Sequence, residues 1–210
     1  MPTSFHEVLA HGTTKLHVVY TILSREVPFF LQQLKERWFD NAVDHDKFLG
    51  LDLEYTADQR GVAVMQLCFA RHVLIFQWAR SDKHCPELMD FLRSGITFAS
   101  VDIRNDKLKM RHSFGIEIPA GCLVDLQTIF RLRHDRTSMA HMAVALIDDS
   151  YADMKTSFQS LSTNFGRRAH LMISTLSMQQ KMHTFHTSCT ARFESSTMAS
   201  VTSRKVDILI

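Results

Sequence analysis

The chain has 210 residues, a formal net charge of +2 at pH 7 and 45% hydrophobic residues. This length allows one domain with a full core plus a further segment, and so small a charge gives no argument for a nucleic-acid partner. The four cysteines form no C-x-x-C pair, which argues against a zinc site or disulfide framework and predicts reduced thiols in a nuclear or cytoplasmic protein. No segment has the roughly 20 apolar residues that a membrane helix needs, and residues 1–11 lack the apolar run of a signal peptide.

The first half of the chain predicts a strand, a helix and a three-stranded meander. Residues 15–23 are rich in β-branched and aromatic side chains, which favours a strand. Apolar side chains at Phe29, Phe30, Leu31, Leu34 and Trp38 then follow helical spacing, with Ser24 placed to cap that helix. Short turns separate three further apolar runs, so these should pair as antiparallel strands. They are residues 48–55, 62–70 and 73–78.

The second half alternates helices and strands as far as about residue 158. Helical spacing that ends at Gly95 predicts one helix, and an apolar face that includes Leu108 predicts the next. This alternation, following a meander, indicates an α/β domain with a mixed sheet. The predicted elements are helix 86–92, strand 97–101, helix 102–112, strand 122–126 running into a helix through residue 132, and helix 138–147.

Two carboxylates stand two residues apart inside the apolar run at 48–55. Successive strand side chains point to opposite faces, so Asp52 and Glu54 should share one face while Leu51 and Leu53 share the other. Neighbouring carboxylates repel each other, and a divalent metal ion is the expected positive group between them. The alternative is a salt-bridged pair on a solvated strand face, which suits the apolar flanks less well.

Metal-dependent hydrolysis of a phosphodiester needs further carboxylates from other elements, arranged around two cations. Asp106 follows strand 97–101 at the start of the next helix and is the expected third ligand, although an aspartate there can also serve as a helix cap. Asp102 is a weaker candidate for the third ligand, because it lies at the end of the strand and could instead cap the helix. We interpret Asp125, at the end of strand 122–126, as a structural cap of the following helix.

Several blocks in order resemble the DEDD-type 3′–5′ exonucleases, in particular the RNase D and Werner-exonuclease group and its small plant members. "FLGLDLEYT" at 48–56 is similar to the first exonuclease motif, and "FASVDIRNDKLKM" at 98–110 is similar to the second, with its aspartate at Asp106. The resemblance extends over residues 12–158. The other blocks are "VMQLCFARHVLIFQ" at 64–77, "VDL" at 124–126 and "SMAHMAVALIDDSYADMK" at 138–155.

The resemblance implies an RNase H-like fold, with a mixed five-stranded sheet flanked by helices. It also implies removal of nucleotides from a 3′ end of nucleic acid, single-stranded or recessed, with two Mg²⁺ or Mn²⁺ ions. Asp52, Glu54 and Asp106 would be the catalytic metal ligands, with Glu54 near the terminal 3′ hydroxyl. The basic side chains on the helix after Asp106 could contact phosphates, although a solvated helix face is the more ordinary interpretation. They are Lys107, Lys109, Arg111 and His112.

The family's third motif, Tyr-x-x-x-Asp, is absent from this chain after Asp106. Lys155 stands four residues after Tyr151, and no histidine stands five residues before an aspartate. From about residue 159 the composition changes: the sequence becomes rich in Ser, Thr, Met and His, and its apolar residues follow neither helical nor strand spacing. We therefore expect an atypical tail over 159–210. If the codons for residues 178–184 are read in a frame that starts one base earlier, they can encode Tyr-Ala-Ala-Lys-Asp-Ala-Tyr, which has the form of the third motif. This suggests that a frame shift replaced the third motif and the last helix.

We therefore expect an exonuclease-like domain over residues 12–158 whose metal site is incomplete and whose hydrolysis is impaired. Loss of a metal ligand together with the water-orienting tyrosine should cost on the order of 10⁴-fold in rate. The alternative is a catalytically inactive module that binds nucleic acid or another protein.

Overall fold

A computed structural model describes residues 2–10, 14–44, 47–101, 103–129, 141, 142 and 144. Its centre is one mixed sheet with strand order β1-β2-β5-β4-β3-β6-β7. The strands are β1 (Thr3–Ala10), β2 (Thr14–Thr21), β3 (Phe48–Tyr55), β4 (Val62–Phe69), β5 (His72–Phe76), β6 (Thr97–Ser100) and β7 (Leu123–Asp125). The helical elements are η1 (Ser24–Glu26), α1 (Val27–Gln33), η2 (Leu34–Phe39), η4 (Trp78–Arg80), α2 (Pro86–Arg93), α3 (Ile103–Phe114), η5 (Ala120–Cys122) and α4 (Leu126–Ile129).

The predicted α/β class and mixed sheet are confirmed. β3, β4 and β5 form the antiparallel meander, and β6 and β7 add to β3 in parallel. The sheet has seven strands where the resemblance implied five, and β1 was not predicted at all. Its sequence is too polar for a clear strand pattern, and it is held by antiparallel pairing with β2 along its whole length.

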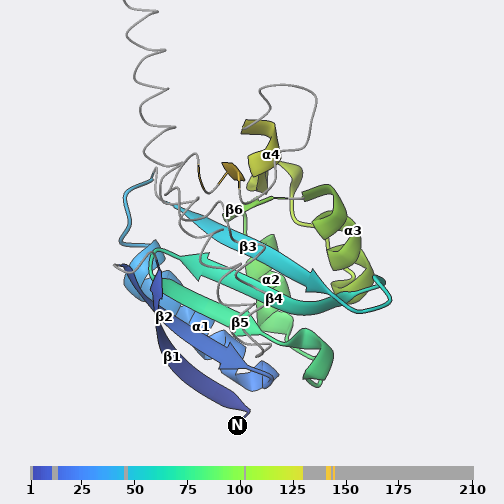
Figure 1. Cartoon of the computed structure of the whole chain (residues 1–210), viewed down its shortest axis with the longest axis horizontal. Coiled ribbons are helices and arrows are strands. Elements are labelled where there is room, and N and C mark those ends of the chain that lie inside the picture. Colours follow the sequence, from blue (N-terminus) through green and yellow to red (C-terminus); the bar gives the residue numbers. More distant parts are fainter. Residues whose placement is uncertain are drawn as a thin grey trace, which may run out of the picture.

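The two faces of the sheet have different hydrophobic clusters. Helical residues such as Val27, Leu34 and Leu88 pack with Leu51 and Leu53 of β3 in the larger cluster. The smaller cluster lies on the other face and is formed by side chains of β2, β4 and β5, among them Leu16, Val64 and Ile75. Figure 1 shows α1 and α2 overlapping the sheet, with α3 beside the end of β3. No helix among the described residues has the length and apolar character to cross a membrane.

Three local predictions differ from the structure. Phe29 and Leu108 were expected on apolar helix faces, but their exposed fractions are 63% and 59%. Each lies on the helix side that no other described element covers. Ser24 does not cap a helix, because its hydroxyl donates a hydrogen bond to the carboxylate of Asp82 instead. Gly95 does end α2, in the left-handed conformation with φ of 85°.

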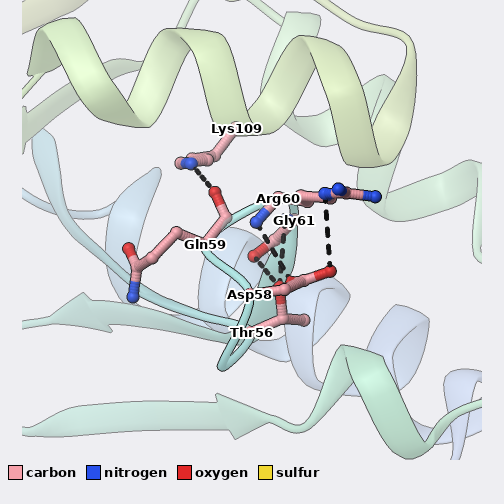
Figure 2. Close-up of polar contacts among 6 residues, drawn as sticks. All are labelled: Thr56, Asp58, Gln59, Arg60, Gly61 and Lys109. Atoms are coloured by element: carbon pink, nitrogen blue, oxygen red, sulfur yellow. Dashed lines mark hydrogen bonds and ion pairs between the residues drawn. The ribbon is translucent and has the colours of Figure 1, made fainter.

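The β3–β4 turn is fixed against the C-terminal half of α3. The Val62 amide donates to Ser113 Oγ at 2.7 Å, and the Lys109 ammonium donates to the backbone carbonyl of Gln59. A Cβ at Gly61 would lie 3.0 Å from Ser113 Oγ, so only glycine allows this approach without displacement. Figure 2 shows the turn below α3, with Lys109 reaching down to it.

Gly61→Ala should lower the free energy of unfolding by about 1 kcal/mol, because the added methyl displaces the hydroxyl that accepts the Val62 amide. In a Ser113→Ala background the same change should be neutral or stabilising, since the hydroxyl is gone and alanine restricts the unfolded chain. Urea unfolding of both single variants and the double variant measures this coupling. Gly121→Ala is the control, because a Cβ there meets nothing within 4 Å. Equal effects of Gly61→Ala in both backgrounds would contradict the proposed contact.

Candidate active site

β3 presents its two carboxylates on the face opposite its leucines, as the alternation predicted. Leu51 and Leu53 are buried, whereas Asp52 and Glu54 keep partial exposure. Asp52 lies opposite Gln66 of β4, whose side-chain amide donates to Asp52 Oδ2 at 2.8 Å. The other amide atom, Gln66 Oε1, is buried without a hydrogen-bond partner in the described part of the chain. The Asp52 carboxylate of β3 is thus held by a polar side chain of the neighbouring strand.

Asp106 lies in the first turn of α3 and is buried, with an exposed fraction of 4%. The Tyr55 hydroxyl donates to Asp106 Oδ1 at 2.8 Å, and the Ser100 hydroxyl donates to Asp106 Oδ2. One carboxylate therefore joins α3 to the end of β3 and to the end of β6.

The three predicted ligands lie within electrostatic range of one another. Burial, together with the neighbouring charges of Glu54 and Asp106, raises the pKa of Asp52 to about 7. A hydrogen bond from the Leu53 amide acts in the opposite direction. Repulsion of this kind is what a divalent cation would relieve.

The donor set fits Mg²⁺ or Mn²⁺ by its chemistry, because all of its members are hard carboxylate oxygens. The described residues nevertheless include no group of three His, Cys, Asp or Glu side chains already gathered around one point. Asp102, the weaker candidate, lies outside the described residues. So do residues 145–210, and with them the expected tail and the region of the third motif.

The side chains that were predicted to contact phosphate differ in the contacts they make. Lys107 is exposed on α3. Lys109 binds the Gln59 carbonyl and lies 5.1 Å from the centroid of the Tyr55 ring, so it holds the β3–β4 turn (Figure 2). Arg111 forms an ion pair with Glu117. Asp125 has the predicted structural role, since its Oδ1 accepts the Gln127 amide at 2.9 Å at the start of α4.

Sequence reasoning missed the residues that position the carboxylates. Tyr55, Ser100 and Gln66 come from three different strands, and none follows a motif that marks a hydrogen bond to an aspartate. The one available signal was that Tyr55 directly follows Glu54 and that Ser100 ends the strand before α3.

Comparison with solved structures shows which fold this chain has. The crystal structure of Trypanosoma brucei RNase D matches with a TM-score of 0.58 and 14% identity over 78% of this chain and 64% of that chain. Its complex with GMP matches with a TM-score of 0.51 and 16% identity over 75% of this chain and 54% of that one. The chain has an RNase D-like fold. It spans less than two thirds of the RNase D chain.

A weaker match is the EXD2 exonuclease domain soaked in Mn and GMP, with a TM-score of 0.42 and 15% identity over 76% of this chain and 84% of that domain. No protein-family model matches the chain, and no curated protein matches it by sequence.

The raised pKa of Asp52 predicts how stability depends on pH when divalent ions are chelated. The folded protein keeps a proton that the unfolded chain releases above pH 4, so this carboxyl group destabilises the fold progressively from about pH 4 to 7. Asp52→Asn removes the titration and should therefore stabilise the fold more at pH 8 than at pH 5. Because Asp52 keeps partial solvent contact, we expect a difference of about 1–2 kcal/mol.

Urea unfolding in EDTA at the two pH values measures the effect. Asp90→Asn, exposed on α2, is the control and should stay within about 0.5 kcal/mol of the unaltered protein. A stabilisation by Asp52→Asn that is equal at pH 5 and pH 8, or larger at pH 5, would refute the assignment.

Tyr55→Phe should cost about 2 kcal/mol of unfolding free energy, because it removes a hydrogen bond to a buried carboxylate. Tyr20→Phe is the matched control, since the Tyr20 hydroxyl donates to the neutral side chain of Gln77 and its loss should cost about 1 kcal/mol. Thermal and urea unfolding of both variants give the comparison. If Tyr20→Phe were the more damaging change, Asp106 would not depend on Tyr55.

Proposed function

We propose that this chain is a 3′–5′ exonuclease-like protein that acts on 3′ ends of nucleic acid with two divalent metal ions, and whose hydrolysis is impaired. The observation that carries the proposal is that the Asp52 carboxylate lies within electrostatic range of Glu54 and Asp106 on an RNase D-like fold. Carboxylates from a strand and a neighbouring helix are what two-metal hydrolysis of a phosphodiester needs. The RNase D structure with bound GMP supports a nucleotide as the product class.

In this proposal Asp52, Glu54 and Asp106 would hold Mg²⁺ or Mn²⁺. The ions would supply a water nucleophile of lowered pKa and charge stabilisation at the leaving oxygen. Tyr55 and Ser100 orient Asp106, and Gln66 orients Asp52, so these two carboxylates are each directed by side chains from other elements. Glu54 would lie near the terminal 3′ hydroxyl.

Impairment follows from the sequence, which has no Tyr-x-x-x-Asp after Asp106. Without that tyrosine and aspartate, the nucleophilic water lacks its orienting group and one cation lacks a ligand. We expect turnover about 10⁴-fold below that of a complete site, which calls for assays at enzyme excess over long times.

The test is incubation of the full chain with 5′-labelled single-stranded and recessed-duplex substrates, with Mn²⁺ or with EDTA. We expect slow shortening from the 3′ end that needs Mn²⁺ and falls at least 10²-fold in Asp52→Asn but not in Asp90→Asn. Binding without shortening would favour the inactive nucleic-acid-binding module. Shortening that persists in EDTA or in Asp52→Asn would refute the proposed site.

A further inference from the structure

A cavity of about 550 Å³ lies beside the β3–β4 turn. Its walls come from that turn, from η4 and the loop after it, and from the end of α3. The apolar part of the lining includes the buried pair Val62 and Trp78. The polar part includes Arg60, Lys83 and His112 from three separate elements.

The charge of this cavity is predominantly positive. Arg60, Lys83 and His112 are exposed at its rim, and Asp58 is the one carboxylate in its lining. Asp58 is already engaged, because it accepts the Thr56 hydroxyl and the Arg60 amide within the turn (Figure 2). The Arg60 guanidinium lies 3.9 Å from Asp58, at the limit of an ion pair, and keeps most of its donors for another anion.

Lys83 is exposed, and its backbone has an unfavourable conformation. Its φ of 57° is left-handed, a conformation that costs a residue with a Cβ about 1 kcal/mol or more. Its amide donates to Ser81 Oγ at 3.0 Å, and Ser81 Oγ donates to the Trp78 carbonyl at 2.8 Å, so the loop is tied to the cavity wall. In the described part of the chain the Lys83 ammonium takes part in no ion pair. A glycine or asparagine would fit this backbone better, which points to a role for the charge.

The separation between His112 and Asp106 along α3 suits a nucleic-acid strand. His112 stands six residues after Asp106 on α3, which is about 9 Å along the helix axis at 1.5 Å per residue. A stacked strand advances about 3.4 Å per nucleotide, so this axial separation of His112 from Asp106 corresponds to two to three nucleotides. Cations around an apolar floor suit a phosphodiester with its sugar, since lysine and arginine bind phosphate and the sugar packs on apolar surface.

We propose that Arg60, Lys83 and His112 bind a phosphate of the single strand whose 3′ end reaches Asp52 and Asp106. The identity of the ligand rests on the proposed function, whereas binding at the cavity does not require turnover.

The test measures binding of a 5′-fluorescein-labelled oligothymidylate of about 12 nucleotides to the full chain in EDTA, by anisotropy over a range of salt. The double variant Arg60→Gln, Lys83→Gly should raise Kd at least tenfold. It should also reduce the slope of log Kd against log salt by about 1.4, the value for two lost contacts to a single strand. Lys83→Gly alone should weaken binding while raising the melting temperature, because glycine relieves the left-handed backbone.

Two controls isolate the cavity. Lys35→Gln, Arg93→Gln removes the same charge from exposed helical positions and should change Kd less than threefold. Ala70→Gly relieves another left-handed residue, φ 50°, at the opposite end of β4 and should stabilise the fold without changing Kd. Equal effects of the two double variants, or no binding by the unaltered chain, would overturn the proposal.

Competition separates the sources of phosphate. Inorganic phosphate and thymidine monophosphate should displace the oligonucleotide only at concentrations at least a hundredfold above its Kd. Displacement by either one near the Kd of the oligonucleotide would make the cavity a free-phosphate site and overturn the strand assignment. Failure of metal-dependent shortening would sink the proposed function but leave the difference between the double variants intact.

Discussion

The buried carboxylate of Asp106 is the contact on which the candidate site depends. It is the point at which α3, β3 and β6 meet, through hydroxyl bonds from Tyr55 and Ser100. Charge-assisted bonds of this kind are about twice as strong as neutral ones, and leaving the carboxylate unpaired in the interior would cost several kcal/mol. The position of α3 therefore follows from how this one side chain is satisfied, and the β3–β4 turn is then fixed by Lys109 and Ser113 farther along the same helix.

The same arrangement carries an electrostatic cost. Asp52 and Glu54 are placed beside Asp106 because β3 alternates its side chains and buries its leucines on the other face. Burial, together with like charges at this spacing, raises the pKa of Asp52 and weakens the fold at neutral pH in the absence of a cation. A fold that keeps such a group in place is better explained by a ligand that relieves the repulsion than by stability alone.

Much of the core architecture follows from the pattern of the sequence. The alternation of Leu51, Asp52, Leu53 and Glu54 predicted β3 and its two faces, and the short turns predicted the meander. Contacts between distant residues did not follow, because no local period reports them. The Tyr55–Asp106 bond joins positions 51 residues apart, and the basic cavity brings together Arg60, Lys83 and His112 from three elements.

Edges and exposed faces were also poorly predicted. β1 is held by its partner strand rather than by its own propensity, and Phe29 and Leu108 are apolar residues at helical spacing that remain exposed. The expected frame-shifted tail over 159–210 lies outside the described residues and stays a prediction.

Direct measurement of Mn²⁺ binding tests the central claim, that the three carboxylates form a cation site. The free Mn²⁺ signal in electron paramagnetic resonance falls as ions bind, and it needs no catalytic turnover. We expect the full chain at pH 8 to bind Mn²⁺, and Asp52→Asn and Asp106→Asn each to lose that binding, while Asp90→Asn retains it. Mn²⁺ binding that is unchanged in Asp52→Asn, or no binding by the unaltered chain at millimolar Mn²⁺, would contradict the account.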